Sequence, residues 1–307
     1  MRAAVSKAFI EYLESVVTPE NILLEEPMHK HTTFRVGGPA EVFVTVDNKE
    51  QLEKIIKYLN LVERPYFILG NGSNLLVGDK GYRGVIIRLG GEFTALKTEG
   101  NLLTAGASVL LSAAAREAME NGLTGMEFAS GIPGSIGGGV KMNAGAYDGE
   151  MRQIVESVQV MYKDGSILDL DNDTMEFGYR NSVIKNRPYV VLQVSLRLQP
   201  GNKEEILARM NELAARRKEK QPLEFASAGS TFKRPEGYFA GKLIMDSGLR
   251  GARIGGAQIS EKHCGFVIND GTAIAADIAE LIQEVVETVR DKFGVTLEPE
   301  VIFLGDF

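Results

Sequence analysis

The sequence predicts an α+β protein built from three successive units. Apolar residues recur at helical spacing in some segments, while short alternating or continuous apolar runs indicate strands in others. Asp164-Gly165 between two such runs predicts a hairpin turn, and Pro200-Gly201-Asn202 marks the expected domain boundary late in the chain. We therefore expect units over residues 1–92, 93–200 and 201–307.

The first unit is expected to combine helices with short strands. Apolar residues recur at helical spacing between Phe9 and Val17, which predicts an amphipathic helix. The alternation over residues 41–46 predicts a strand, and Asp47 can then cap a helix over residues 49–60. The apolar runs "YFIL" and "GVIIRL" predict buried strands on either side of "GNGSNLLVGDKGYR".

The second and third units also mix strands and helices. In the second, "NLLTAGAS" predicts a strand, Ser108 is expected to cap a helix through Met119, and "YVVLQVSLRL" predicts a long final strand. In the third, we expect a charged helix over residues 203–220, a strand at "HCGFVIN", a helix over residues 277–293 and a final strand at "EPEVIFLG".

The composition is that of an ordinary soluble protein, with 44% hydrophobic and 24% charged residues in 307. No apolar run approaches the roughly 18 residues needed to cross a bilayer, and the N-terminus lacks the features of a signal peptide. Cys264 is the only cysteine, which excludes an internal disulfide and fits a reducing compartment. We therefore expect a cytoplasmic protein that does not use a membrane.

The net charge of −7 argues against broad nucleic-acid binding, because such proteins usually carry a basic surface. An anionic small molecule is still possible, since a local basic cluster such as "ARRKEKQ" or "FKRP" can oppose the overall sign. His29, His31 and His263 do not have the spacing of a metal site, so we expect no metal. No obligate protein partner is inferred.

Two glycine-rich segments are candidates for holding phosphates: residues 70–76 and residues 130–147. Glycine lets a backbone approach a ligand closely and present its N–H groups in a concave nest. Neither segment matches the P-loop or the dinucleotide fingerprint of Rossmann domains. Tight turns at a sheet edge are the ordinary interpretation of one such loop, but two loops together favour the pyrophosphate of a dinucleotide.

Six motifs identify the family that the chain resembles. They are "TTFRVGGPA", "LGNGSNLLV", "GIPGSIGGGVKMNAGAY", "YRNS", "GSTFKRP" and "LEPEV", and they span residues 30 to 305, approximately. Their order and spacing resemble those of the UDP-N-acetylenolpyruvoylglucosamine reductases. The resemblance implies a two-lobed, vanillyl-alcohol-oxidase-like (PCMH-type) FAD-binding domain, formed by the first two units, and an α+β substrate-binding domain after it. It also implies an NADPH-dependent flavoenzyme that reduces UDP-N-acetylglucosamine enolpyruvate to UDP-N-acetylmuramate for peptidoglycan synthesis.

The resemblance assigns three catalytic residues. Arg180 in "YRNS" matches the family's arginine at the substrate carboxylate, where a planar guanidinium can bind both oxygens of a developing enolate. Ser230 in "GSTF" matches the serine that protonates the carbanion, and Glu300 in "LEPEV" matches a carboxyl near the substrate carboxylate. Without the family, a surface ion pair, a turn serine and an edge-strand glutamate are the ordinary interpretations.

The substrate diphosphate is expected to contact Lys220, Lys233 and Arg234. Tyr179 is expected either to contact flavin or substrate or to belong to the hydrophobic core. Arginine stands at position 234 where much of the family has asparagine, and only about fifty residues separate "YRNS" from "GSTF". Both observations suggest the variant of the family that lacks an extra substrate-covering loop.

FAD is expected to bind noncovalently, because neither glycine loop contains a histidine. The resemblance assigns to FAD an arginine and residues from both loops: Arg35, Asn71, Gly72, Ser73, Asn74, Gly131, Ile132, Pro133, Gly134, Ser135, Gly137, Gly138, Asn143, Ala144 and Gly145.

Two alternatives remain at this point. The first is another FAD-dependent oxidoreductase of the same fold, which acts on an alcohol or a lactone. The second is a catalytically silent protein that binds a nucleotide sugar. The motifs that contain Arg180, Ser230 and Glu300 argue against both.

Overall fold

The computed structural model describes residues 5–307 and divides the chain into two compact units. Residues 1–4 lie outside the described residues. Unit 1 comprises the chain up to Glu25, Glu41–Asn71 and Gly84–Ala215, and unit 2 comprises Glu26–Ala40, Gly72–Arg83 and Arg216–Phe307. Each unit is thus assembled from segments that are far apart in the sequence.

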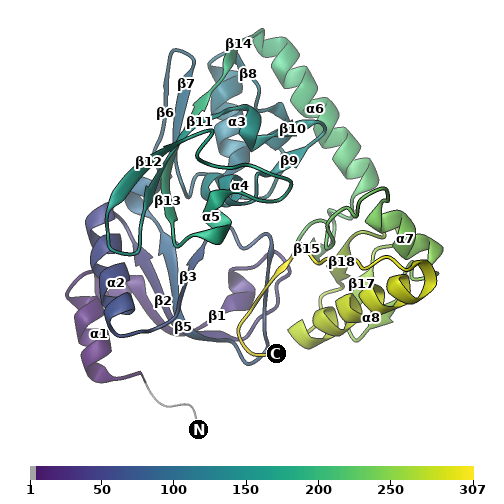
Figure 1. The fold of residues 1–307 in the computed structure, drawn as a ribbon, viewed down its shortest axis with the longest axis horizontal. Coiled ribbons are helices and arrows are strands. Elements are labelled where there is room, and N and C mark those ends of the chain that lie inside the picture. The colour runs from purple at the N-terminus through teal and green to yellow at the C-terminus, as the bar shows by residue number, and fades with distance from the viewer. Residues whose placement is uncertain (1–4) are drawn as a thin grey trace. The chain divides into compact units, whose positions relative to one another are not determined.

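A four-stranded sheet, most of which belongs to unit 1, has the strand order β1-β2-β5-β3, with β3 and β5 parallel. The early elements are α1 (Lys7–Glu14), η1 (Pro19–Asn21), β1 (Ile22–Pro27), η2 (Met28–Lys30), β2 (Pro39–Val46), α2 (Lys49–Leu61), β3 (Tyr66–Leu69) and β5 (Tyr82–Leu89). The apolar face of α2 packs into one core with β2 and β5, and Figure 1 shows α2 beside this sheet. The predicted N-terminal helix, strands and second helix are confirmed.

The second sheet of unit 1 is five-stranded and antiparallel, with the order β12-β11-β13-β7-β6. The predicted hairpin joins β11 to β12, and Gly165 has a φ of +87° at its turn. The remaining elements are η3 (Gly91–Thr94), β6 (Leu96–Glu99), β7 (Leu102–Gly106), α3 (Leu111–Glu120), β8 (Leu123–Thr124), η4 (Glu127–Ala129), α4 (Ile136–Lys141), β9 (Gly145–Ala146), β10 (Gly149–Glu150), η5 (Met151–Gln153), β11 (Val155–Met161), β12 (Ile167–Asp171), α5 (Val183–Asn186), β13 (Val190–Arg197) and β14 (Gln199–Pro200).

Two predicted helix caps are wrong. The N-cap of α2 is Asn48, whose side chain accepts a hydrogen bond from Gln51 N, while the Asp47 carboxylate accepts from Asn21 Nδ2 (2.9 Å). Helix α3 begins at Leu111, and Ser108 Oγ donates to Leu89 O instead (2.7 Å). In both places, the side chain that the local sequence pattern assigns to the cap forms a hydrogen bond with a distant residue instead.

Unit 2 contains a four-stranded sheet of order β15-β18-β17-β16 and a separate parallel pair of β4 with β19. The charged helix α6 (Lys203–Lys220) is confirmed, and it contributes residues to both units. The other elements of unit 2 are β4 (Leu75–Val77), β15 (Ala226–Ser227), α7 (Ala240–Asp246), β16 (Arg253–Ile254), β17 (Ala257–Ile259), β18 (Val267–Asn269), α8 (Ala275–Phe293) and β19 (Ile302–Leu304). The long C-terminal helix was predicted, but it begins two residues earlier than expected.

Early chain segments belong to the core of unit 2. Phe34 and Leu76 lie in one apolar cluster with residues of α7 and α8. Asn269 Nδ2 donates to Phe34 O (2.9 Å), and β4 pairs with β19 near the C-terminus. The fold of unit 2 therefore depends on residues that precede most of unit 1 in the sequence.

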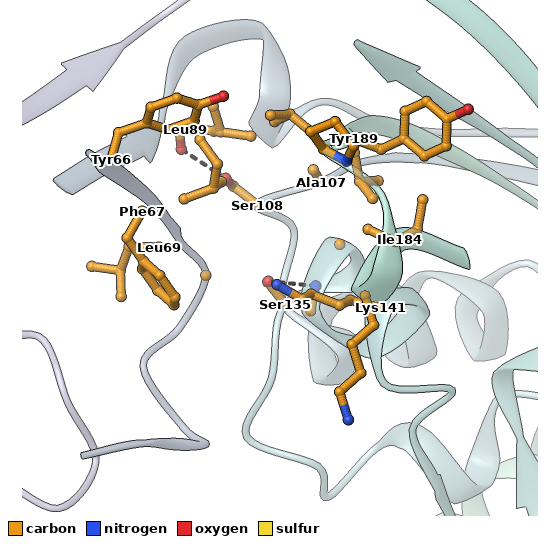
Figure 2. Close-up of a pocket in the computed structure, with 18 of the residues that line it drawn as sticks. Tyr66, Phe67, Leu69, Leu89, Ala107, Ser108, Ser135, Lys141, Ile184 and Tyr189 are labelled. Atoms are coloured by element: carbon orange, nitrogen blue, oxygen red, sulfur yellow. Dashed lines mark hydrogen bonds between the residues drawn. The ribbon is translucent and has the colours of Figure 1, made fainter. Parts of the chain in front are cut away.

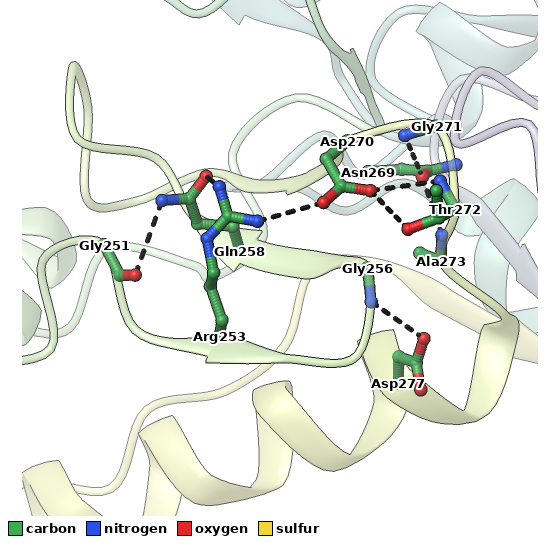
Figure 3. Close-up of polar contacts among 10 residues, drawn as sticks. All are labelled: Gly251, Arg253, Gly256, Gln258, Asn269, Asp270, Gly271, Thr272, Ala273 and Asp277. Atoms are coloured by element: carbon green, nitrogen blue, oxygen red, sulfur yellow. Dashed lines mark hydrogen bonds and ion pairs between the residues drawn. The ribbon is translucent and has the colours of Figure 1, made fainter.

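A polar network holds the β16–β17 hairpin to the turn before α8 (Figure 3). The Arg253 guanidinium donates to Asp270 Oδ2 (2.9 Å) and to Gln258 Oε1 (2.7 Å). Asp270 also accepts from the Thr272 hydroxyl and N–H, and these bonds, followed by the contact with Arg253, hold the pKa of Asp270 below its ordinary value. This network fixes the turn that leads into α8. Within α8, Asp277 accepts a hydrogen bond from Gly256 N (3.2 Å), which adds a contact between the hairpin and the helix.

Asp79 caps α8 from a distant part of the chain. Its carboxylate accepts from Ala275 N and from Ala276 N, both at 2.8 Å. Carboxylates stabilise helix N-termini by satisfying free N–H groups and by opposing the helix dipole. We expect Asp79→Ala to lower the free energy of unfolding by about 1–2 kcal/mol, and Asp79→Asn, which keeps one acceptor, to lower it less. Chemical denaturation measures both; equal stability of the three proteins would contradict the assignment.

None of the helices in residues 5–307 is long and apolar enough to cross a membrane.

Candidate functional site

Unit 1 contains a cavity of about 250 Å³ that is bordered by both glycine-rich loops. Its wall comes from β3 and the adjoining Gly70, from the end of β5, from Ala107 and Ser108, from α4 and the residue before it, and from α5 and the segment that follows it. Figure 2 shows Tyr66 and Ser108 on one side of the cavity and Tyr189 on another, with Ser135 at the start of α4.

Glycine keeps the backbone around Ser135 open. Ser135 is the N-cap of α4, and its hydroxyl accepts from Gly138 N (3.3 Å). A Cβ added at Gly70 would lie 2.9 Å from Ser135 Oγ, and one at Gly138 would lie 3.4 Å from it. A side chain at Gly70 would therefore crowd the serine that lines the cavity, whereas a Cβ at Gly138 would only reach van der Waals contact with it.

Other glycines of the second loop are needed for packing within the protein. A Cβ at Gly137 would lie 3.1 Å from the Ala107 side chain, and one at Gly139 would lie 3.2 Å from Leu111. At Gly145 the added atom would be 2.6 Å from Gly149 O. Close packing therefore accounts for part of the glycine content of this loop, a cause that was not predicted from the sequence.

The described cavity lining contains three basic residues, Lys141, Lys185 and Arg187, and no Asp or Glu. Burial lowers the pKa of Lys141, and the nearby charge of Lys185 lowers it further. A bound anion would relieve this repulsion. A basic cluster was expected in "ARRKEKQ" and "FKRP", and this one was not predicted, although Lys141 lies inside the second glycine loop.

The cavity lining contains groups of the kinds that bind phosphates. Asn71 Nδ2 donates to Pro133 O (2.7 Å), which ties the first glycine loop to the second. The wall offers glycine backbone, serine hydroxyls and positive charge, all of which suit a diphosphate. Whole-ligand pockets commonly measure about 300–1,000 Å³, so this cavity, at about 250 Å³, has room for only part of a dinucleotide.

Arg180 occupies an unusual turn. Gly178 N donates to Asn181 O (3.0 Å), and Asn181 N donates to Gly178 O (3.2 Å), which places Tyr179 and Arg180 at the tip. Arg180 has a φ of +52°, a conformation that usually requires glycine or asparagine. Its guanidinium carbon lies 5.2 Å from the centroid of the Tyr179 ring, and the Tyr179 residue is 56% exposed.

In unit 2, the backbone of Glu300 is bonded to Thr231, the fully buried residue that follows Ser230. Thr231 N donates to Gly265 O (2.8 Å), its hydroxyl accepts from Val267 N (3.0 Å), and its carbonyl accepts from Glu300 N (2.8 Å). The exposed Ser230 precedes this anchored residue. Asn74 Nδ2 donates to Glu300 O (3.0 Å), so a residue assigned to FAD also holds the backbone of a predicted catalytic residue.

The predicted final strand was too long. Glu298 and Glu300 precede β19, which begins at Ile302, so neither lies in the strand that was predicted to contain them. Pro299 forms only an isolated bridge with Phe232. Glu298 accepts a hydrogen bond from the Lys233 side chain, whose exposed fraction is 20%. Lys233 therefore shares its charge with a carboxylate.

The other predicted substrate cations lie on the surface of unit 2. Lys220 is exposed in the last turn of α6. The Arg234 guanidinium lies 4.0 Å from the centroid of the Phe239 ring, and its Nε donates to Tyr238 O (3.3 Å). Both aromatic residues are substantially exposed.

The predicted site residues fall into two sets. Unit 1 contains Asn71, Gly131, Ile132, Pro133, Gly134, Ser135, Gly137, Gly138, Asn143, Ala144, Gly145, Tyr179 and Arg180. Unit 2 contains Arg35, Gly72, Ser73, Asn74, Lys220, Ser230, Lys233, Arg234 and Glu300. The structure also brings Ser108, Lys141, Lys185, Arg187 and Tyr189, which were not predicted, to the wall of the cavity.

Comparison with known proteins identifies the class of protein to which this chain belongs. The FAD binding domain family matches residues 40–171, which include much of the cavity wall. A grass pollen allergen with glucose dehydrogenase activity has a similar structure, with a TM-score of 0.51 and 11% identity over 64% of this chain and 44% of that chain; this likeness shows the fold alone. The protein is an α+β flavoprotein with a PCMH-type FAD-binding domain.

The family follows from much closer relatives. The C-terminal domain of UDP-N-acetylenolpyruvoylglucosamine reductase matches residues 221–304. The reductase of Lachnoclostridium phytofermentans is 50% identical over 98% of both chains, and that of Clostridioides difficile is 51% identical over 96% of this chain and 97% of its own. The crystal structure of the Thermus caldophilus reductase has a TM-score of 0.80 and 41% identity, and covers 92% of this chain and 98% of its own. The chain belongs to the UDP-N-acetylenolpyruvoylglucosamine reductase family.

Proposed function

We propose that this chain catalyses the reaction of its family, the NADPH-dependent and FAD-mediated reduction of UDP-N-acetylglucosamine enolpyruvate to UDP-N-acetylmuramate in peptidoglycan synthesis. The observation that carries the proposal is the match to both the FAD-binding part and the reductase-specific C-terminal part of the family within one chain. When bound, FAD supplies hydride transfer from NADPH to the terminal vinyl carbon of the substrate.

Three side chains act on the charge and proton of this reaction. The Arg180 guanidinium binds the substrate carboxylate, and this contact strengthens as negative charge develops there. The Ser230 hydroxyl donates a proton to the carbon beside the carboxylate. Glu300 contacts the same carboxylate region. The hydrogen bond from Glu300 N to Thr231 O, with Ser230 adjacent in the chain, supports this joint role.

The UDP moiety is bound in part by Lys220, Lys233 and Arg234. Tyr179, which precedes Arg180 at the tip of its turn, contacts the substrate as well. Lys233 must exchange its contact with Glu298 for the diphosphate, or share its charge between the two. Glu298→Gln should therefore strengthen binding of free UDP, because it removes the competing negative charge. Isothermal titration calorimetry measures this change, and weaker binding by Glu298→Gln than by the wild type would contradict the role of Lys233.

FAD is held noncovalently by Arg35 and by residues of the two glycine loops, with Lys141, Lys185 and Arg187 adding positive charge at the cavity. Gly72 illustrates how tightly the first loop is built. It has a φ of +62°, and an added Cβ would lie 1.9 Å from His31 O. Alanine cannot fit there without displacing the backbone.

We expect Gly72→Ala to weaken FAD binding by about tenfold or more, a change of at least about 1.4 kcal/mol. Gly100→Ala is the matched control, because Gly100 has a similar φ of +58° but nothing within 4 Å of an added Cβ. Flavin titration of the two apoproteins measures the difference. Equal loss of affinity in both variants would show that backbone conformation alone, and not displacement of the loop, causes the effect.

The wider organisation follows the family. We propose lobes at residues 1–92 and 93–200, with Glu26–Ala40 and Gly72–Arg83 of the first lobe clustering with the C-terminal unit, a substrate-binding domain at residues 201–307, and the variant without an extra substrate-covering loop. The partner is a small UDP-sugar, and the protein acts in the cytoplasm without a nucleic acid, a membrane, a metal or an obligate protein partner.

One experiment tests the reaction. The purified protein should be yellow, and it should oxidise NADPH when given the enolpyruvyl sugar nucleotide. A colourless protein without flavin that leaves NADPH unchanged would overturn the proposal. Rapid reduction of the bound flavin by an alcohol or a lactone, without turnover of the sugar nucleotide, would favour the other oxidoreductase.

A further inference from the structure

We infer that Asn143 and Ser182 hold the turn of Arg180 against the C-terminal end of α4 and are positioning residues for the reaction. The inference rests on the proposed function for the role of Arg180. The contacts that carry it lie entirely within unit 1.

Ser182 provides the first contact. It follows the Arg180 turn directly, its exposed fraction is 0%, and its hydroxyl donates to Lys141 O (2.9 Å). Lys141 is the last residue of α4, and the final carbonyls of a helix have no partner within the helix. The bond therefore satisfies a helix end and ties it to the residues after Arg180.

Asn143 provides the second contact, on the other side of the turn. Its Nδ2 donates to Gly178 O and to Glu150 Oε2, both at 3.1 Å, and its Oδ1 accepts from Arg152 N (2.9 Å). Both N–H bonds of the amide are thus used inside the protein, and the exposed fraction of the residue is 1%. The two N–H groups of this side chain are engaged with the protein, and the contact with Gly178 O gives Asn143 a positioning role in addition to its place in the loop assigned to FAD.

The backbone of Arg180 explains why two contacts are needed. A non-glycine residue with positive φ is strained, and such a conformation persists where the surrounding structure enforces it. Asn143 fixes the carbonyl of Gly178 before Arg180, and Ser182 fixes the chain after it. Because Gly137, Gly138 and Lys141 of α4 also line the cavity, the same short helix carries the cavity wall and the catalytic turn.

The test uses Ser182→Ala and Asn143→Gly, since glycine tolerates the φ of +43° at position 143 and removes only the side chain. In stopped-flow measurements, Ser182→Ala should reduce its flavin with NADPH within about twofold of the wild type, and the reoxidation step is measured in both variants. Reoxidation by the sugar nucleotide should slow about threefold to tenfold, the effect of losing hydrogen bonds of ordinary strength. In the Arg180→Ala background, neither substitution should slow reoxidation further, because both act through Arg180.

A second readout does not depend on catalysis. Trypsin cleavage of the Arg180–Asn181 bond, followed by mass spectrometry, should accelerate about threefold to tenfold in both variants because the turn opens more often. Asn269→Ala is the matched control: Asn269 is 5% exposed and also makes three side-chain hydrogen bonds, but in unit 2. It should leave cleavage at Arg180 unchanged.

The outcomes separate the two proposals. Unchanged cleavage in Ser182→Ala and Asn143→Gly, or an equal slowing of reoxidation with and without Arg180, would overturn the positioning role. A third outcome is that the wild type fails to turn over the sugar nucleotide while both variants are still cleaved faster at Arg180. That result would support the hold of Asn143 and Ser182 on the turn and would refute the proposed function.

Discussion

Ser230→Ala should slow flavin reoxidation by the enolpyruvyl substrate about 10²–10⁴-fold, the usual contribution of a positioned proton donor. Flavin reduction by NADPH should stay within about twofold of the wild type, because that step does not use the proton of Ser230. Stopped-flow absorbance of the flavin in each half-reaction measures both rates.

The structure makes this variant easy to interpret. Ser230 is exposed, while the neighbouring backbone is anchored through Thr231, so loss of the hydroxyl should change stability by less than about 0.5 kcal/mol. Ser227→Ala in β15 is a control that should affect neither half-reaction. If Ser230→Ala reoxidised at the wild-type rate, another group would have to be the proton donor.

Arg180→Ala and Arg180→Gly should both slow reoxidation about 10²–10³-fold, the loss expected when one preorganised donor to a developing anion is removed. The two variants should differ in stability. Because the φ of residue 180 is +52°, the Cβ of alanine costs about 1–2 kcal/mol there, and the greater flexibility of glycine in the unfolded chain offsets about 0.5–1 kcal/mol of this. Arg180→Gly should therefore be more stable than Arg180→Ala by about 0.5–1 kcal/mol.

Urea denaturation of the two variants measures this difference, and both lose the contact between the guanidinium and the Tyr179 ring equally. Higher stability of Arg180→Ala would show that the turn relaxes and that its positive φ is not enforced. Faster turnover by either variant than by the wild type would refute the role of Arg180 in catalysis.

Local elements and the family were predictable from sequence. The apolar face of α2, with Leu52, Ile55, Ile56 and Leu59, is visible as spacing alone, and the Asp164-Gly165 hairpin is visible as a turn between apolar runs. Helix caps were less predictable, because Asp47 and Ser108 have the right chemistry for a cap but form tertiary hydrogen bonds instead.

The site was predictable in part. The motifs pointed to both glycine loops, and the structure joins the two through the hydrogen bond from Asn71 to Pro133. The basic cavity lining was missed, because Lys141 and Lys185 are more than forty residues apart and only the packing of α4 beside α5 brings them to one wall. The positions of Glu298 and Glu300 were misjudged for a similar reason, since the extended segment before β19 is held by Thr231 and Asn74 and not by a sheet.

By itself, the sequence determined the periodic helices, the hairpin, the family and the motifs that contain the predicted catalytic residues, because all of these are encoded by neighbours at short, fixed spacing. Only the tertiary structure decided that residues 26–40 and 72–83 belong with the C-terminal unit, and that Asp79 caps a helix almost two hundred residues later. It also decided that Arg180 lies at a strained turn held by Asn143 and Ser182. These features depend on hydrogen bonds and packing between distant segments, and such contacts leave no periodic pattern in the chain.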